Sequence, residues 1–267
     1  MAAPAQSDRK RLLRAALTPW LAALALLGLW QWASQAGWLP VVLFSSPSAV
    51  ARAAQSVAAS GELWVQIQIS LLRAVVALLV GGGLGLALGV LNGLSRTQAG
   101  VLDAALRLLG NVTVVAFIPL LLLGAGVQEG AKLTLLSAGV FFPVYLGVVH
   151  GIRGVDPALI EMARAAGLTG WPLLRDVMLP GALPSLLSGL RFALALLWGL
   201  IIAVEALDAQ SGIGSLATRV RDIAPADLAL LAVLLYVALG KATDVLVTAS
   251  TRRLLRWAPA VRRAGAY

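Results

Sequence analysis

Long apolar runs alternate with short polar segments along the whole chain. A transmembrane helix needs about 20 mostly apolar residues to cross a hydrocarbon layer about 30 Å thick. Six runs meet this requirement. We predict membrane-spanning helices at about 20–38, 71–94, 106–124, 132–150, 183–205 and 228–248. The pattern therefore predicts an all-α integral membrane protein with six transmembrane helices.

Two connecting segments, 39–70 and 151–182, are too long to be simple turns. Connections longer than about 12–15 residues are usually functional or unstructured. The alternation of sides places the segment 39–70 outside the cell and the segment 151–182 in the cytoplasm.

The cytoplasmic segment 151–182 carries helix signals. Asp156 followed by Pro157 is typical of an N-cap and a first helical residue. Gly167 is typical of a helix end. We predict a first short helix over 158–166, then a turn and a second short helix within 168–176 that ends before the fifth span. The prolines expected to end it are Pro180 and Pro184. The segment is thus predicted to form a helical hairpin.

Composition excludes several classes of protein. The 267 residues are 60% hydrophobic and only 12% charged, whereas soluble domains have about 25% charged residues. The absence of cysteine excludes disulfide scaffolds, thiolate catalysis and zinc–thiolate sites. The single histidine, His150, leaves no histidine cluster for a metal. Gly240-Lys241 lacks the remainder of a P-loop. We expect no catalytic residue, no metal and no cofactor.

The net charge is +9, and most of the basic residues lie in the segments between the apolar runs. Basic residues flank the apolar runs, so the charge indicates membrane orientation rather than nucleic-acid binding. With both termini cytoplasmic, most of the 21 Lys and Arg residues lie inside. The outer side would hold Arg52, Arg73, Lys132, Arg219 and Arg221. We expect cytoplasmic tails at 1–18 and 251–267 around a transmembrane domain at 19–250. A cleaved signal peptide is the alternative for the first span, but no convincing small-x-small cleavage site follows it.

Polar residues inside the predicted spans are candidates for a translocation path, because charge in a membrane is costly. Lys241 and Asp244 are three residues apart and can contact each other. They form either a self-satisfied pair or an anion-attracting group. Glu205 and Asp208, near the outer end of the fifth span, are candidate gate or interface residues. Helix-to-helix hydrogen bonding is the alternative role for the smaller polar residues. The candidate path residues are Asn111, Thr113, Ser137, Glu205, Lys241 and Asp244.

Glycine recurs every fourth residue in the second span, at Gly81, Gly85, Gly89 and Gly93. This spacing puts the glycines on one helix face, where another helix can approach to backbone contact. The face indicates either ordinary packing within the chain or a helix that moves against a partner during transport.

The cytoplasmic segment also contains a spaced motif. Glu161-Met162-Ala163 is followed after three residues by Gly167, and nine residues later by the run 177–180, Val-Met-Leu-Pro. This resembles the EAA motif of the permease subunits of binding-protein-dependent ABC importers. Met162 replaces the usual middle alanine, and the residue at 177 is valine rather than isoleucine.

Shorter matches extend the resemblance from about residue 45 to the end of the sixth span. They include the runs 60–64, 141–143 and 211–214. Together they are most similar to the aliphatic sulfonate permeases. Two runs depart from that group: 111–113 is Asn-Val-Thr instead of Asn-Val-Pro, and 124–126 is Gly-Ala-Gly instead of Trp-Phe-Gly. The loss of the two aromatic residues would widen or reshape this region.

The resemblance implies a type I ABC importer permease fold in a bacterial inner membrane. It implies a second permease copy, two ATP-binding subunits and an external substrate-binding protein as partners. The cargo would be a small organic anion, such as an aliphatic sulfonate. The segment 151–182 would dock in the ATP-binding subunit and transmit its motion. The expected coupling residues are Glu161, Met162, Ala163, Ala166, Gly167, Leu179 and Pro180.

Three alternatives remain at this point. Within the same family, the substrate would be taurine, nitrate or bicarbonate, or a thiamine precursor. An intramembrane enzyme would need catalytic residues inside the spans, and the sequence offers no such set. A stand-alone secondary transporter would leave the capped cytoplasmic hairpin without a role.

Overall fold

The computed structural model describes residues 25–38, 45–94, 114–117, 124, 126, 128–207, 210–218 and 226–255. Within these ranges the secondary structure is entirely helical. Four helical stretches are long and apolar enough to cross a membrane: Glu62–Leu94, Glu129–Arg153, Trp171–Leu207 and Ala226–Leu254. They confirm the second, fourth, fifth and sixth predicted spans.

The other two predicted spans fall largely on residues that the structure does not describe. In the first, residues 25–35 are helical. In the third, the 3₁₀ turn η2 (Val114–Phe117) is described. The described residues therefore establish an all-helical protein with four spans and leave the count of six as a prediction.

The described residues fall into two compact units, divided after Val65, after Ser215 and after Leu234. The unit that contains the N-terminal part of the chain holds α2 (Pro47–Ala59). Ser46 caps this helix by accepting a hydrogen bond from the backbone N–H of Ala49 at 3.3 Å. The helix at 25–35 is bonded to α2 through Gln31, whose side-chain amide both donates to and accepts from Ser48, at 3.0 and 3.1 Å.

The prediction of one long outer loop at 39–70 is wrong for the part that is described. A helix, α2, occupies its middle, and the second span begins at Glu62 rather than near residue 71. Ser46 and Pro47 supply the N-cap and first-turn signals for α2. Gly61, with φ of +78°, makes the turn that precedes the span.

The second unit contains the bundle that positions the candidate sites. The helices of this bundle are α3 (Glu62–Ala77), η1 (Leu78–Gly82), α4 (Gly83–Leu94), α7 (Glu129–Arg153), α8 (Pro157–Ala165), α9 (Trp171–Leu173), η3 (Leu174–Met178), α10 (Leu179–Leu207), α11 (Ile213–Thr218) and α12 (Ala226–Leu254). The π-helical turn η1 joins α3 and α4 into one continuous span. The first residues of α3, the end of α11 and the start of α12 belong to the other unit.

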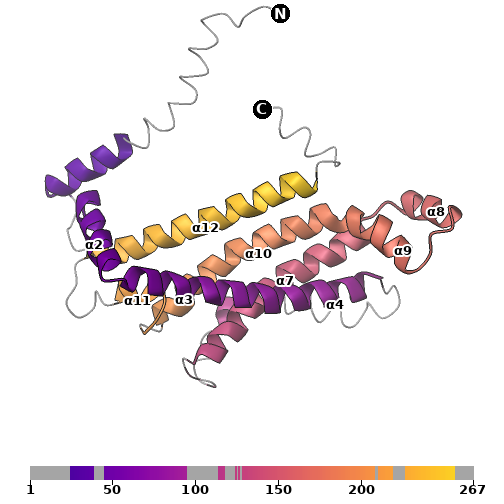
Figure 1. The fold of residues 1–267 in the computed structure, drawn as a ribbon, viewed down its shortest axis with the longest axis horizontal. Helices are drawn as coiled ribbons and strands as arrows, with labels where there is room; N and C mark the ends of the chain where they lie inside the picture. The colour runs from indigo at the N-terminus through magenta and orange to yellow at the C-terminus, as the bar shows by residue number, and fades with distance from the viewer. Residues whose placement is uncertain are drawn as a thin grey trace, which may run out of the picture. The chain divides into compact units, whose positions relative to one another are not determined.

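Helix α7 lies between α4 and α10 and packs along both (Figure 1). It is the most buried of the four spans, with 61% of its most apolar window inside the fold. Tyr145 at its centre is fully buried and accepts a hydrogen bond from the side-chain amide of Asn92 on α4. Because lipid is as apolar as leucine, such close packing and polar contacts stabilise the bundle.

The repeated glycines of η1 and α4 face α7. A Cβ atom at Gly85 would lie 2.8 Å from the carbonyl oxygen of Phe141, and one at Gly89 would lie 2.8 Å from Cβ of Val148. The interpretation of this face as packing within the chain is confirmed. On the other side of α7, Gly147 meets Gly189 of α10, where an added Cβ would lie 3.1 Å from the neighbouring Cα.

The prediction that Pro180 and Pro184 end a helix before the fifth span is wrong. The helix that starts at Trp171 continues through η3 into α10, and Pro184 lies inside α10. Membrane helices tolerate proline when local adjustment satisfies the freed carbonyl groups. Here a π-helical turn precedes the prolines, and Ser188 donates to the carbonyl oxygen of Pro184 at 3.0 Å.

Two cations assigned to the outer loops are inside helices instead. Arg73 lies in α3 with 3% of its surface exposed, and Lys132 lies in α7 with 4% exposed. They should be removed from the loop charges that set orientation, because the orientation rule counts charges in loops. Both belong to a polar cluster inside the bundle, described below.

Candidate functional site

Helix α8, in the hairpin between α7 and α10, is capped at both ends by the residues that the sequence predicted. The Asp156 side chain accepts from the backbone N–H of Ala158 at 2.9 Å, and Pro157 occupies the first turn. At the other end, Gly167 has φ of +85°. Its N–H donates to the carbonyl of Arg164 at 2.9 Å, and the N–H of Leu168 donates to that of Ala163 at 3.0 Å. This pair of bonds is a Schellman motif, which gives the hairpin a defined reversal.

The two faces of α8 differ in chemistry. Ala163 is 7% exposed and packs inside the fold. Leu159 and Met162 are 43% and 65% exposed, and Ala166 is exposed as well. The spacing of three and four residues puts these three side chains on one apolar stripe. Trp171, 65% exposed, lies across the turn at the start of α9.

The other predicted coupling residues lie around this stripe. Glu161 is exposed on α8 beside Met162. Gly167 forms the turn, while Leu179 and Pro180 are half-buried in the first turn of α10. The motif therefore spans both arms of the hairpin, and Ala163 contributes to its internal packing rather than to its exposed surface.

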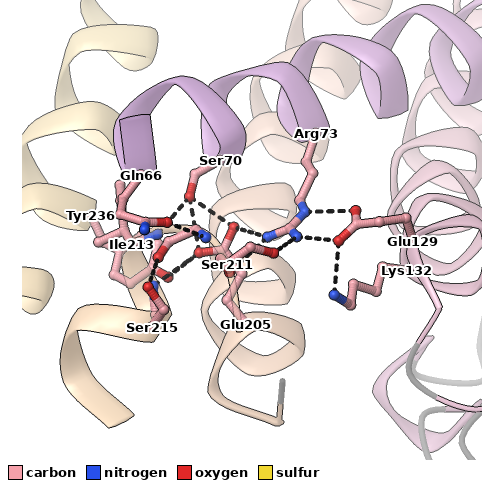
Figure 2. Close-up of polar contacts among 12 residues, drawn as sticks. Gln66, Ser70, Arg73, Glu129, Lys132, Glu205, Ser211, Ile213, Ser215 and Tyr236 are labelled. Atoms are coloured by element: carbon pink, nitrogen blue, oxygen red, sulfur yellow. Dashed lines mark hydrogen bonds and ion pairs between the residues drawn. The ribbon is translucent and has the colours of Figure 1, made fainter. Parts of the chain in front are cut away.

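A second group of polar residues lies at the opposite end of α7 and α10 from the hairpin. Figure 2 shows this group around Glu205, whose side chain has no exposed surface. The carboxylate accepts from Ser70 Oγ at 2.7 Å, Arg73 Nη1 at 2.8 Å, Tyr236 Oη at 2.8 Å and the N–H of Gly214 at 3.0 Å. A buried carboxylate with this many donors is stable in its charged form.

Arg73 joins Glu205 to a second carboxylate. Its Nε donates to Glu129 at 3.1 Å, and its Nη2 also contacts Glu129. Lys132 donates to the same carboxylate at 2.9 Å. Two cations thus face two carboxylates, in a row that Figure 2 shows from Lys132 to Glu205. We call these four residues the buried charge network after its three buried members, since the Glu129 side chain is 54% exposed; their charges balance.

The buried charge network and its neighbours also bind the loop after α10. The N–H groups of Gly212, Ile213 and Gly214 donate to Gln66, Ser70 and Glu205 at 2.7, 3.0 and 3.0 Å. Arg73 donates to the carbonyl and hydroxyl oxygens of Ser211 at 3.1 and 2.6 Å. Three successive backbone donors are satisfied by side chains of α3 and α10, so the run 211–214 is held in one conformation.

Sequence reasoning identified Glu205 and the run 211–214 but not their partners. Gln66, Ser70 and Arg73 are spaced four and three residues apart, which puts them on one face of α3. A polar face on an otherwise apolar helix was the signal that could have found them. Glu205 is buried and hydrogen-bonded within the bundle, and its role as a gate or interface residue stays a prediction.

The remaining path candidates are dispersed. Asn111 and Thr113, and Asp208 beside Glu205, lie outside the described residues. Ser137 is half-buried on α7, where its carbonyl group faces the backbone of Gly81. Lys241 and Asp244 do contact each other on α12, with Nζ 3.5 Å from Oδ2.

Asp244 has a second partner that the sequence did not suggest. Arg191 on α10 donates through Nε to Asp244 Oδ1 at 2.7 Å. Arg191 lies inside α10, within the fifth predicted span. A cavity of about 400 Å³ lies beside this pair, between α10 and α12. It is lined by Arg191, Leu194, Ala195, Trp198, Gly240, Thr243, Asp244 and Val247.

Known proteins resemble this chain over nearly its full length. Residues 81–256 match the family described as the inner membrane component of binding-protein-dependent transport systems. A permease of Escherichia coli (strain K12) named for aliphatic sulfonates transport is 45% identical, over 94% of this chain and 95% of its own. Its counterpart in Bacillus subtilis (strain 168) is 33% identical, over 87% of this chain and 84% of its own.

A more distant relative is the taurine transport system permease protein of Escherichia coli (strain K12). It is 30% identical, over 73% of this chain and 71% of its own. These relatives are permease subunits rather than enzymes. Together with the four apolar helices, the match indicates a multi-pass protein of the inner membrane. The chain belongs to the family of inner membrane components of binding-protein-dependent transport systems.

Proposed function

We propose that this chain is the permease subunit of an ABC importer that moves aliphatic sulfonates into the cell. The observation that carries the substrate class is the 45% identity, over nearly the full length of both chains, to a permease named for aliphatic sulfonates. The chain would form the path for the cargo, while a separate subunit hydrolyses ATP.

The α7–α10 hairpin supports the coupling role. Its reversal is fixed by Asp156 and Gly167, and its exposed surface is the apolar stripe of Leu159, Met162 and Ala166. A capped helix transmits a displacement, whereas a flexible loop absorbs it. The stripe would seat in the ATP-binding subunit, and Glu161 would orient the helix or pair with that partner.

The assembly that we propose has two copies of the permease, two ATP-binding subunits and one external binding protein. Each hairpin faces the cytoplasm in this arrangement, and so do both termini. Closure of the ATP-binding subunits would draw the two permeases together at the hairpins and open the path outward. This is alternating access by rigid-body motion.

Taurine is a second candidate cargo. The taurine permease is 30% identical to this chain, and taurine is itself a sulfonate with an added amine. The lower identity makes an uncharged alkyl chain the better expectation. The two substrates are separated by uptake measurements with each of them.

A growth and uptake assay tests this proposal. The chain is expressed with its ATP-binding and substrate-binding partners in a host that lacks sulfonate uptake. We expect uptake of ethanesulfonate and growth on it as sole sulfur source. Uptake of taurine alone would contradict the preference for an uncharged alkyl chain and favour the second candidate cargo. Sulfonate uptake by the chain without its ATP-binding partner would contradict the ABC importer function.

Two hairpin variants test coupling in the same assay. Gly167→Pro demands a φ near −65° where the chain has +85°, so it should displace the turn. Glu161→Arg reverses an exposed charge, and Glu161→Gln is its matched control. We expect both disruptive variants to insert in the membrane, to lose at least tenfold in uptake, and to leave ATP hydrolysis running. Uptake at the unaltered rate would show that the hairpin is not the coupling element.

A further inference from the structure

Three charged residues lie near the middle of two membrane spans, on exposed faces. Arg191 is near the centre of α10, and Lys241 and Asp244 are near the centre of α12. The side chains of Arg191 and Lys241 are 60% and 72% exposed. A cation at the centre of a lipid-facing helix is energetically costly, so such residues normally face protein or a water-filled cavity.

The surface of α3, η1 and α4 in the same unit is suited to contact with lipid. The exposed large side chains on α3, η1 and α4 include Leu72, Leu79 and Leu91, which are all apolar. Helices α10 and α12 expose apolar side chains too, including Phe192, Val237 and Val245, but Arg191 and Lys241 interrupt this surface with charge. We infer that it faces the aqueous path rather than the hydrocarbon.

This face carries a surplus positive charge. Asp244 is the partner of both cations, with Arg191 Nε at 2.7 Å and Lys241 Nζ at 3.5 Å. Arg191 contacts Asp244 through Nε. Among the described residues, no acceptor lies within hydrogen-bond distance of the two terminal amino groups of the guanidinium. One carboxylate cannot neutralise two cations. The balanced buried charge network around Arg73 shows the opposite arrangement.

The cavity of about 400 Å³ beside Arg191 has one polar end and apolar walls. Leu194, Trp198 and Val247 contribute apolar surface. Thr243 Oγ1 accepts a hydrogen bond from the indole N–H of Trp198 at 2.9 Å. The same hydroxyl group donates to backbone carbonyl oxygens of α12, those of Gly240 and Leu239, at 2.8 and 3.1 Å. Arg191 is thus the donor in this cavity that has capacity left for an anion.

We propose that this cavity is an anion-binding subsite on the translocation path, with Arg191 receiving the head group of an alkyl sulfonate. A guanidinium donates two parallel hydrogen bonds to a planar pair of oxygens, and the apolar walls would take the short alkyl tail. Asp244 serves as the internal counter-ion of Arg191 when no cargo is present. The choice of a sulfonate rests on the proposed function, whereas the anion preference rests on the geometry alone.

The absence of cysteine makes a direct test simple. Ala195 is exposed and lines the cavity, so Ala195→Cys places a single thiol there. The complete transporter is treated with 2-sulfonatoethyl methanethiosulfonate and, separately, with its trimethylammonium analogue of similar size. Each reagent forms a mixed disulfide and releases methanesulfinate. The ratio of the anionic to the cationic rate constant measures the local preference for an anion.

We expect the ratio at A195C to fall about tenfold when Arg191→Gln is added, because a cleft lined by one sign of charge raises the local counter-ion concentration by about tenfold or more. Arg191→Lys keeps the charge and should keep most of the preference. Arg252→Gln is the matched control, since Arg252 is an exposed cation of α12 outside the cavity. It should leave the ratio unchanged.

Two results would overturn the subsite. One is an equal ratio with and without Arg191, and the other is a transport-competent A195C that reacts with neither reagent. Sulfonate uptake by the same A195C transporter is measured in parallel. An Arg191-dependent preference without any sulfonate uptake would keep the anion subsite and reject the proposed cargo. Uptake without the preference would reject the subsite and keep the proposed function.

Discussion

At the scale of single residues, Glu205 is a buried carboxylate held by hydrogen bonds from several elements. Removing a carboxylate from water costs several kcal/mol unless partners compensate. Here Ser70, Arg73, Tyr236 and the N–H of Gly214 all donate to it. Because these donors come from α3, α12 and the first turn of α11, Glu205 holds several parts of the unit together.

We expect Glu205→Gln to destabilise the protein strongly. The amide keeps the shape but leaves Arg73 with one carboxylate fewer, and breaking a buried ion pair costs about 3–5 kcal/mol. The midpoint of thermal unfolding of the purified permease, without its ATP-binding partner, should fall by several degrees. Glu161→Gln, an exposed acid, is the matched control and should leave the midpoint unchanged. A wild-type midpoint for E205Q would show that the network does not stabilise the fold.

Residue roles were only partly predictable from the sequence. Arg73 and Lys132 were counted as loop charges because composition shows that a charge exists but not what faces it. Glu129 and Glu205, which lie 56 and 132 positions from Arg73, become its partners only through the packing of three spans. The contact of Lys241 with Asp244 was predictable, because helix geometry alone sets a spacing of three.

At the scale of helices, the contact of α4 with α7 depends on missing side chains. Gly85 allows the carbonyl of Phe141 to approach within 2.8 Å of where a Cβ would lie. A larger residue must push the backbones apart, because a carbonyl group in a helix cannot rotate away.

We therefore expect Gly85→Ala to lower the stability of the protein by about 1–3 kcal/mol, the usual cost of overpacking. Gly83→Ala on the same helix is the matched control, because nothing lies within 4 Å of a Cβ there. It should be neutral or slightly stabilising, since alanine favours helix over glycine by up to about 1 kcal/mol. Thermal unfolding of the two variants measures the difference, and equal midpoints would contradict the packing described.

The hairpin gives the second prediction at this scale. Met162→Glu puts a charge at the centre of the exposed apolar stripe without touching the caps of α8. We expect at least a tenfold loss of ATP-binding subunit copurified after mild detergent extraction, with the permease still inserted. Ala51→Glu adds the same charge at an exposed position of α2 and should retain the subunit. Undiminished copurification with M162E would place the docking surface elsewhere.

Short-range signals explain which elements the sequence predicted well. The start of α8 at Pro157 and the turn at Gly167 follow from local rules for caps. Pro184 was misread because the rule for proline was applied without the neighbours that satisfy the freed carbonyl groups. The start of the second span at Glu62 was placed too late, because Gln66, Ser70 and Arg73 made a buried polar face look like a loop.

At the scale of the whole subunit, two sites lie at opposite ends of the same helices. Helix α7 runs from Glu129 in the buried charge network to Arg153 beside the hairpin. Its 25 residues span about 37 Å at 1.5 Å per residue. Helix α10 returns from the hairpin to Glu205 without a break. A displacement of the hairpin would therefore be carried along continuous helices rather than through flexible loops.

The class of protein was accessible from the sequence, whereas its assembly was not. Apolar length predicted the spans, and the spaced motif at Glu161 and Gly167 pointed to the family that the comparisons establish. The number of copies and the path between them depend on surfaces that meet other chains. Arg191 illustrates the limit, since its exposure and its partner on α12 had to be seen before a role could be proposed.

The sidedness of Met162 tests the central claim most directly. Met162→Cys introduces the single thiol of the chain at the proposed docking surface. A membrane-impermeant maleimide should label it in inside-out vesicles, and bound ATP-binding subunit should block the label. Labelling in intact right-side-out spheroplasts would put the hairpin on the outer face, where no ATP-driven partner could reach it, and would contradict the account.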